Sequence, residues 1–346
     1  MHKRLMQRAL QLAEKGRYTC SPNPMVGCVI VRDGVIVGEG CHRRRGEAHA
    51  EINALAQAGD AAAGAIAYVS LEPCCHHGYT PPCIDALIAA KIGQVVISCL
   101  DPNAKVAGKG VLALQAAGIE VITGIEEAAG LALNHIFFHA VSTQRPYVIA
   151  KYAMSIDGKL ATHNGDSKWL TGSLAREHVH QWRHRVDAIL IGSGTVIQDD
   201  PQLTVRLPDT KIPEEQQPMR IILDGKKVIP KQAKIFAADL PGETLLASQI
   251  VADNTKPIEL DQLLDKLYLR GINALIVEGG AKTLTQFFAS DRIDEIHCYI
   301  AAKLVGGAAA PTAFMGVGID NMQQARHFTL LAMENFANDV LLTYRR

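Results

Sequence analysis

Two segments decide how this chain is interpreted, and they read His49-Ala50-Glu51 and Leu71-Glu72-Pro73-Cys74-Cys75-His76-His77-Gly78-Tyr79-Thr80-Pro81-Pro82-Cys83. They supply one imidazole, His49, and two well-placed thiols, Cys74 and Cys83. Three such ligands occupy three corners of a tetrahedral zinc site and leave the fourth corner for water, as in catalytic zinc sites. The sequence therefore predicts a catalytic zinc centre on His49, Cys74 and Cys83.

The residues around these segments predict the elements that hold them. An apolar helical pattern follows Glu51, so His49 and Glu51 are expected in the first turn of a helix. Residues 65–71 have the composition of a strand that runs into Pro73. Two prolines then start a second helix at 83–90. Both cysteines are therefore expected near a helix N-terminus, where the positive end of the helix dipole favours a thiolate.

Cysteine and histidine also have more ordinary roles. A lone Cys is most often a small buried hydrophobe, and a lone His in a helix is usually a surface or core residue. A structural zinc site, or no metal at all, is therefore the alternative. His-x-Glu before a helix, together with Pro-Cys after a strand, favours the catalytic site. Strand alternation predicts that Cys75 points away from Cys74, outside the site.

Glu51 has the position of a proton-transfer residue. Zinc deaminases of nucleobases carry H-x-E followed by P-C-x-x-C, and their Glu is not a ligand but moves protons between the zinc-bound water and the base. The chain matches the first half of this signature and Pro73-Cys74. Its second thiol comes late, at Cys83, and His77 stands where the signature expects it. Glu51 is accordingly predicted to be catalytic.

With Asn23-Pro24-x-Val26-Gly27, the two segments resemble the deaminase half of the bifunctional riboflavin-biosynthesis deaminase/reductases, a family with the same late second cysteine. The resemblance covers most of the first 145 residues, and the second half is similar to the reductase half. It implies a cytidine-deaminase-like, three-layer α/β deaminase domain at residues 1–144. A dihydrofolate-reductase-like reductase domain at 145–346 would follow.

The composition limits the possible functions. A chain of 346 residues is expected to form two domains, and 48% hydrophobic residues suffice for two cores. Lys+Arg and Asp+Glu both number 35, so the net charge is zero. A zero net charge argues against binding nucleic acid through a large basic surface but permits a local phosphate pocket. Eight cysteines and no leader or membrane-spanning run suggest the cytoplasm. A homo-oligomer is expected, because two-domain metabolic enzymes commonly self-associate.

Alternating helices and strands predict a layered α/β first half. The Asp33-Gly34 pair is a hairpin signal between strands at 26–31 and 35–39. Further strands are expected at 95–100 and 119–123, with a helix at 111–117 between them. The domain boundary is placed near residues 143–146, because Pro146 cannot continue the preceding helix.

The second half contains two buried strands that run into glycine-rich turns, Gly192-Ser193-Gly194 and Gly279-Gly280, each followed by a helix. Such turns let the backbone approach a phosphate, which the helix N-terminus attracts. Ile197 replaces the third glycine of the Rossmann fingerprint, so a Rossmann domain is not expected. The resemblance implies NADPH as the cofactor; an unrelated α/β domain is the alternative.

The resemblance also implies roles for individual residues. NADPH would contact Ala153, Trp169, Thr195, Asp199, Gly280, Ala281, Lys282, Thr283, Leu284, Thr285 and Gln286. The substrates would contact Asn23 in the first domain, and Ser167, Arg183, Leu203, Arg206 and Glu278 in the second. Position in the chain, rather than the resemblance, adds three expected substrate contacts: His42 after a strand, His76 between the two cysteine ligands, and Lys151 on an inward face of a strand.

Several of these residues have a second interpretation. Asn23 could serve only in a turn, and His42 could simply be exposed. Arg183 and Arg206 suit a ribose phosphate, because a guanidinium binds phosphate through paired N–H groups; the alternative for each is a surface ion pair. Lys151 is expected either to polarise the ribose carbonyl or to pair with an aspartate, Asp199.

The resemblance implies two successive reactions. A zinc-activated water, with Glu51 as proton carrier, would deaminate 2,5-diamino-6-ribosylamino-4(3H)-pyrimidinone 5′-phosphate. NADPH would then reduce the ribosyl chain of 5-amino-6-(5-phosphoribosylamino)uracil to ribityl. Three alternatives stay open: a deaminase for a nucleic-acid base, a non-enzymatic zinc-binding module, and a deaminase with an inactive reductase half.

Overall fold

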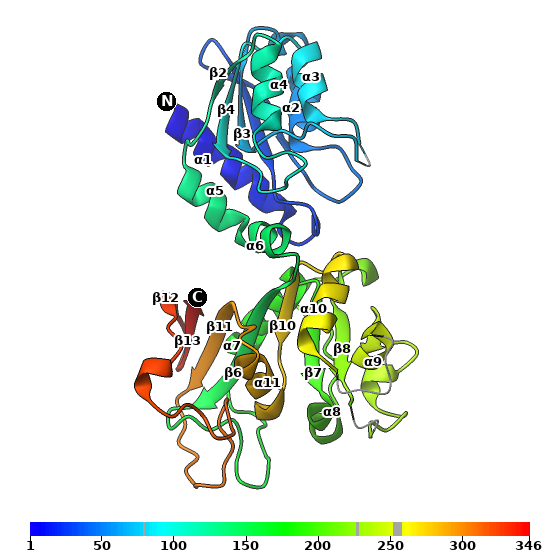
Figure 1. Ribbon diagram of the computed structural model, residues 1–346, viewed down its shortest axis with the longest axis vertical. Coiled ribbons are helices and arrows are strands. Elements are labelled where there is room, and N and C mark those ends of the chain that lie inside the picture. The colour runs from blue at the N-terminus through cyan, green and yellow to red at the C-terminus, as the bar shows by residue number, and fades with distance from the viewer. Residues whose placement is uncertain (79, 226–227, 252–257) are drawn as a thin grey trace. The chain divides into compact units, whose positions relative to one another are not determined.

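Two sheets organise the chain, one in each of two units, Met1–Gln144 and Arg145–Arg346 (Figure 1). The computed structural model describes residues 1–78, 80–225, 228–251 and 258–346. Within these ranges, no helix combines the length and the hydropathy needed to cross a membrane.

The first unit is built on a five-stranded sheet of order β2-β1-β3-β4-β5. Its strands are β1 (Gly27–Arg32), β2 (Val35–Cys41), β3 (Ile66–Leu71), β4 (Gln94–Cys99) and β5 (Glu120–Ile122). β1 pairs antiparallel with β2 and β3, and the remaining pairs are parallel. Asp33 and Gly34, both with positive φ, join β1 to β2, which is the tight turn that an Asp-Gly pair favours.

Helices cover both faces of this sheet, so the unit has three layers. One face packs against α1 (His2–Ala13) and α5 (Glu127–Leu133). The opposite face packs against α2 (Ala50–Ala58), α3 (Cys83–Ala89) and α4 (Lys109–Ala116), which lie together in Figure 1. α6 (His135–Thr143) ends the unit. The predicted elements of this half are found with ends shifted by at most two residues.

Glycines in β2 bring α2 unusually close to the sheet. A Cβ on Gly40 would overlap the carbonyl oxygen of Ala50, and Gly38 lies equally close to the next turn of α2. The helix therefore packs directly on strand backbone. His49 is the N-cap residue of α2 and Glu51 lies in its first turn, so this contact sets the position of both residues.

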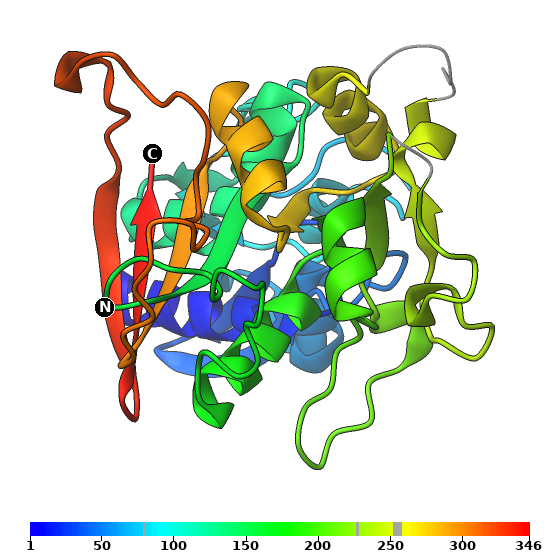
Figure 2. The same cartoon turned by 90° about the horizontal axis from the view of Figure 1, so that it is seen from below.

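The second unit contains an eight-stranded sheet of order β12-β13-β11-β6-β10-β7-β8-β9. The parallel strands are β6 (Tyr147–Ser155), β7 (Ala188–Gly192), β8 (Met219–Leu223), β9 (Thr244–Leu246), β10 (Ala274–Val277) and β11 (Glu295–Ala301). β12 (Thr329–Phe336) and β13 (Asp339–Arg345) add an antiparallel hairpin beside β11. Figure 2 shows this hairpin, in red, at one edge of the sheet.

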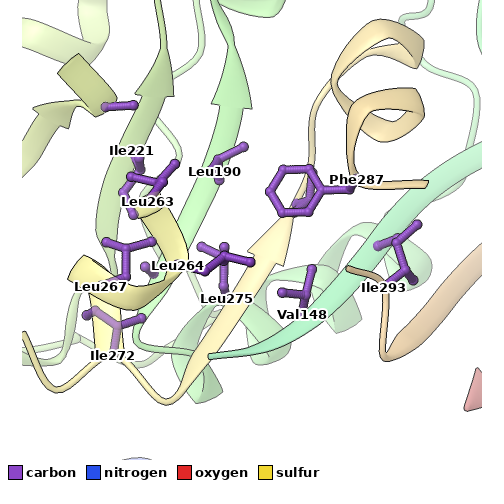
Figure 3. Close-up of a cluster of buried hydrophobic side chains, with 14 of the residues drawn as sticks. Val148, Leu190, Ile221, Leu263, Leu264, Leu267, Ile272, Leu275, Phe287 and Ile293 are labelled. Atoms are coloured by element: carbon purple, nitrogen blue, oxygen red, sulfur yellow. The ribbon is translucent and has the colours of Figure 1, made fainter. Parts of the chain in front are cut away.

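The hydrophobic core of the second unit lies between one face of the sheet and two helices, α10 (Leu260–Leu269) and α11 (Ala281–Ala289). Leu263, Leu267 and Phe287 from these helices meet Leu275 of the central strand β10 (Figure 3). Each fully buried side chain of this kind contributes about 1.5–3 kcal/mol to stability. α7 (Ser173–Arg185) packs on the opposite face. The helices α8 (Ser193–Asp199) and α9 (Ala247–Val251) follow β7 and β9.

Candidate active sites

Three ligand-type side chains meet at the N-terminal ends of α2 and α3. Nδ1 of His49 lies 3.0 Å from Sγ of Cys83 and 3.5 Å from Sγ of Cys74. The three ligand atoms all lie within 4.8 Å of one another. The opposite ring nitrogen of His49 lies 3.2 Å from Oγ1 of Thr80, a contact that fixes the orientation of the ring.

The donor set fits zinc. One imidazole and two thiols are ligands that zinc prefers, and three protein ligands are typical of catalytic sites. The backbone N–H of Cys83 donates to Sγ of Cys74 at 3.3 Å. Hydrogen bonding from the Cys83 thiol lowers the pKa of Cys74 to about 4 and raises the pKa of Cys83. The pair thus holds a thiolate at neutral pH, the form that binds a metal.

Glu51 is buried beside this cluster, with 3% of its surface exposed. Burial, followed by the nearby Cys74 thiolate, raises the pKa of Glu51 to about 7. A carboxyl group with such a pKa can accept and release a proton near neutral pH, which general acid–base catalysis requires. The geometry therefore allows Glu51 the proton-transfer role that the sequence predicts.

Asn23 and His42 form a polar pair next to the cluster. Nδ2 of Asn23 lies 3.0 Å from Nε2 of His42, and the His42 ring is 5.1 Å from the ring of His49. His42 is only 2% exposed, so the interpretation of an exposed histidine is wrong. Burial lowers the pKa of His42, which favours a neutral ring that accepts from Asn23 and donates to the carbonyl of Ala48 at 3.3 Å.

The loop between the two cysteine ligands contains His76 and Cys75. Nδ1 of His76 is buried and has no hydrogen-bond partner among the described residues, so it can receive one from a ligand. Cys75 lies beyond the end of β3 at Leu71, so strand alternation cannot determine its direction. Its thiol instead contacts the carbonyl oxygen of Lys105 at 3.5 Å, outside the ligand cluster.

Glu72 lies beside the metal cluster, and its sequence position alone predicts no role for it. Its side chain is buried, and its carboxylate accepts backbone N–H groups from residues 101–111. The only sequence signal for it is its position directly before Pro73-Cys74 in the metal-binding segment.

The second unit has a cavity of ≈1610 Å³ at the carboxyl ends of its central parallel strands, where ligands bind in open α/β sheets. Two glycine-rich turns meet there. The N–H of Gly280 donates to Oγ1 of Thr195 at 3.1 Å, and a Cβ on Gly192 would overlap the hydroxyl of Thr283. A side chain at position 192 would therefore displace the Thr283 hydroxyl from its place between the two turns.

Most residues expected to contact the cofactor line this cavity: Ala153, Trp169, Thr195, Asp199, Gly280, Ala281, Lys282, Thr283 and Gln286. Leu284 and Thr285 do not. Leu284 is fully buried in the hydrophobic core, and the hydroxyl of Thr285 donates to the carbonyl oxygen of Ala281 at 2.7 Å. These two side chains differ in direction from their neighbours because successive residues of a helix point in different directions.

The residues expected to contact the second substrate also line the cavity: Lys151, Ser167, Arg183, Leu203, Arg206 and Glu278. Nε and Nη2 of Arg183 donate to the two oxygens of Glu278 at 2.7 and 3.0 Å. Nζ of Lys151 lies 3.7 Å from the same carboxylate. Lys151 thus pairs with Glu278 rather than with Asp199, and the Arg183 ion pair is buried rather than on the surface.

The pKa values in this buried cluster of two cations and one anion are shifted. Burial alone would raise the pKa of Glu278, but Arg183 and Lys151 together lower it to about 2. Burial also lowers the pKa of Lys151, against the opposing effect of Glu278. The carboxylate is therefore charged at neutral pH and holds both cations in place.

Arg206 has a different environment. Its guanidinium donates to two neutral oxygens, Oγ1 of Thr204 at 2.8 Å and Oε1 of Gln202 at 3.4 Å. Nδ1 of His180, on α7, accepts the backbone N–H of Arg206 at 3.1 Å. Burial and the neighbouring Arg183 lower the pKa of His180 to about 4, so its ring is neutral. His180 was not expected from the sequence to belong to the site, although it lies one helical turn from Arg183.

Family models match both parts of the chain. The model for the "RibD C-terminal domain" matches residues 146–342, and the model for the "Cytidine and deoxycytidylate deaminase zinc-binding region" matches residues 1–99. The riboflavin biosynthesis protein RibD of Actinobacillus pleuropneumoniae is 43% identical over 98% of this chain and 94% of its own length. RibD of Escherichia coli (strain K12) is 40% identical over 97% of each chain.

Solved structures resemble the chain over nearly its full length. Acinetobacter baumannii RibD, form 1, superimposes with a TM-score of 0.91 at 42% identity, covering 99% of this chain and 98% of its own. A protein from Thermotoga maritima has a TM-score of 0.86 at 34% identity with the same coverage. It is described as a diaminohydroxyphosphoribosylaminopyrimidine deaminase/5-amino-6-(5-phosphoribosylamino)uracil reductase.

Proposed function

Because this chain belongs to the RibD family of bifunctional riboflavin-biosynthesis deaminase/reductases, we propose which of its residues perform the two reactions. The predicted fold class is confirmed, with a zinc-binding deaminase domain followed by a dihydrofolate-reductase-like reductase domain. We assign these domains to residues 1–144 and 145–346, an assignment supported by the two compact units. The main support for the proposed catalytic residues is the convergence of His49, Cys74 and Cys83 beside Glu51.

We assign the substrates from the activities named for the Thermotoga maritima relative. The first domain would hydrolyse the amino group of 2,5-diamino-6-ribosylamino-4(3H)-pyrimidinone 5′-phosphate and release ammonia. The second domain would reduce the ribosyl chain of the product, 5-amino-6-(5-phosphoribosylamino)uracil, to ribityl.

In the first domain, His49, Cys74 and Cys83 would hold zinc, which when bound supplies the Lewis acidity that activates a water. Glu51 takes a proton from the attacking water and delivers protons to the ring nitrogen and then to the departing ammonia. Its pKa of about 7 suits both directions of transfer. Thr80 keeps the ring of His49 in position by the contact at Nε2.

We propose that Asn23, His42 and His76 contact the pyrimidine substrate. Asn23 and His42 present a neutral, hydrogen-bonded pair beside the cluster. The buried Nδ1 of His76 would gain a hydrogen-bond partner when the substrate binds, which removes the penalty for leaving a buried polar atom unpaired.

In the second domain, NADPH when bound supplies the hydride. We propose that the two glycine-rich turns receive its pyrophosphate, because their backbone is accessible and α11 begins there. The ring of Trp169 stacks on the guanidinium of Arg176 at 4.5 Å and offers a flat apolar surface to the cofactor. The other proposed contacts come from the cavity-lining residues Ala153, Thr195, Asp199, Lys282, Thr283 and Gln286.

We assign the ribose end of the substrate to Lys151 and the phosphate to Arg206. Lys151 is held by Glu278 and can donate a proton or hydrogen bond to a sugar oxygen as the sugar is reduced. Nε and Nη2 of Arg183 are already bound to Glu278, and its Nη1 donates to the carbonyl oxygen of Thr204, so its role is to hold that carboxylate. Within the described parts of the chain, the Arg206 guanidinium donates to neutral oxygens, so its positive charge is available to bind a phosphate.

We also propose that the enzyme self-associates in the cytoplasm. Leu330, Leu331 and Met333 are 51%, 48% and 68% exposed on β12, the edge strand of the larger sheet, and an exposed apolar edge favours pairing with a second copy. All eight cysteines are free, as is usual in a reducing compartment. Leu331→Lys is expected to lower the particle mass in light scattering; an unchanged mass would exclude this edge.

A two-stage assay tests the assignment of the two domains. Glu51→Gln should abolish ammonia release while NADPH oxidation on the pre-deaminated substrate continues at the parent rate. Metal analysis of the same samples should find zinc in both proteins, since Glu51 is not a ligand. Equal loss of both activities in a folded, zinc-loaded variant would contradict separate sites.

A further inference from the structure

One buried carboxylate of the first domain takes no part in the chemistry proposed above. Glu72 is 3% exposed and lies just beyond the end of β3, two residues before the ligand Cys74. A charged group is rarely buried unless it is fully hydrogen-bonded. Its partners therefore indicate what it does.

Glu72 binds four main-chain amides of a single segment. Oε1 accepts the N–H of Gly110 at 2.9 Å and of Val111 at 3.2 Å. Oε2 accepts the N–H of Gly108 at 2.9 Å and of Asp101 at 3.2 Å. Two carboxylate oxygens offer about four acceptor positions, so this side chain is saturated. It ties the whole segment 101–111, between β4 and α4, to the end of β3.

The same segment lies directly against the metal-binding segment. A Cβ on Gly110 would overlap the carbonyl oxygen of Pro73, so the two backbones are in contact next to Cys74. Farther along the segment, the carbonyl oxygen of Lys105 accepts a hydrogen bond from the Cys75 thiol at 3.5 Å. Burial, with Glu72 and Cys74 nearby, raises the pKa of Asp101 to about 6. Segment 101–111 thus borders the metal cluster.

We propose that Glu72 is a positioning residue for deamination, which holds segment 101–111 against Pro73-Cys74 and thereby fixes one wall of the base-binding pocket. The inference rests on the proposed deaminase function of this domain. Glu72 itself does not touch the substrate. A glutamine at position 72 would present an NH₂ group to two of the four amides, which would then lose their acceptor. Part of segment 101–111 would no longer be held against Pro73-Cys74.

The test compares Glu72→Gln with the parent in the full chain. We expect the KM for ammonia release to rise roughly tenfold, the size expected when buried amides lose their acceptor. The kcat should stay within about twofold, because no group that acts in the transition state is changed. Zinc content and NADPH oxidation on the pre-deaminated substrate should equal those of the parent. Hydrogen exchange of the amides of Gly108 and Gly110 should accelerate.

A matched control makes the same chemical change at a carboxylate outside this contact. Glu39 on β2 accepts from Arg8 at 2.7 and 2.8 Å, so Glu39→Gln breaks a carboxylate interaction in the same domain without touching segment 101–111. It should leave the KM for ammonia release unchanged.

An unchanged KM in zinc-loaded Glu72→Gln would overturn the proposal. Loss of zinc from the variant would also overturn it, because the carboxylate would then act on the metal site rather than on the pocket wall. If Glu72→Gln fails to fold, Gly110→Ala pushes the same two segments apart from the other side. It should raise the KM with zinc retained, and an unchanged KM would be a refutation. A parent protein that releases no ammonia would instead refute the proposed function.

Discussion

Replacing Glu278 by Gln should destabilise the reductase domain far more than breaking an ion pair of the same geometry at the surface. Both oxygens of Glu278 accept from Arg183, at 2.7 and 3.0 Å. Asp261 accepts from Arg292 in the same forked way, at 2.6 and 3.0 Å. The two carboxylate side chains differ in exposure, 6% for Glu278 and 61% for Asp261.

Burial decides the expected magnitude. Glu278→Gln leaves two buried cations, Arg183 and Lys151, without their counter-charge, and removing one partner of a buried ion pair costs about 3–5 kcal/mol. Asp261→Asn breaks an exposed pair, which is worth about 0–1 kcal/mol. For a domain of this size, the corresponding falls in Tm are about 6–20 °C for the first variant and no more than about 4 °C for the second.

Fluorescence provides an assay that sees only the reductase domain. The chain has two tryptophans, Trp169 and Trp182, and both belong to the second unit. Urea unfolding followed by tryptophan emission therefore measures the free energy of unfolding of that domain. Glu278→Gln should also lose NADPH oxidation while ammonia release continues. Equal shifts of the unfolding midpoint in Glu278→Gln and Asp261→Asn would refute the reasoning from burial.

Four further predictions concern both domains. His180→Phe removes the acceptor for the backbone N–H of Arg206, so it should raise the KM of the phosphorylated reductase substrate roughly tenfold while the KM for NADPH stays unchanged. His180→Asn keeps an acceptor and should have a KM close to that of the parent. Equal effects of both variants would argue against a role of His180 in positioning Arg206. The pKa of Glu278 is about 2, below its usual 4.5, so its stabilisation is complete above pH 4.5 and is lost as pH falls toward 2; tryptophan-monitored stability should fall more steeply in acid for the parent than for Glu278→Gln. Gly40→Ala should displace α2 and destabilise the deaminase domain by about 1–3 kcal/mol, with ammonia release reduced and NADPH oxidation retained in steady-state assays. Removing zinc with a chelator should abolish ammonia release reversibly and leave NADPH oxidation unaffected.

The metal cluster could be predicted from sequence because its residue types are chemically restrictive. An imidazole and two thiols near helix starts have few other reasons to occur together, and the structure brings His49, Cys74 and Cys83 to one point. The glycine-rich turns of the second domain could be located for a similar reason. Glycine lets a backbone approach another group closely, as Gly192 approaches the Thr283 hydroxyl.

The partners of charged residues could not be predicted, because they are set by contacts far apart in the chain. The amides bound by Glu72 come from residues 29 to 39 positions away. Lys151 pairs with Glu278, in the turn that follows β10, and not with Asp199. For the segment after Gly280, the resemblance named consecutive residues, although a helix presents only some of them to one side. Leu284 is accordingly directed into the core.

The proposed metal ligands of the deaminase site and its proposed substrate-binding side chains lie within residues 23–83, and segment 101–111 of the same domain adds the proposed pocket wall. The described residues that line the reductase cavity all lie within residues 151–315. Among the described residues, the reacting groups proposed for each catalytic centre come from one half of the chain. A gene cut between the codons for Gln144 and Arg145 would therefore yield two polypeptides that each retain a full set of reacting groups. In a mixture of the two fragments, the two reactions would be linked only by an intermediate that diffuses freely. The amount of intermediate that accumulates would therefore measure how much the covalent link contributes to flux.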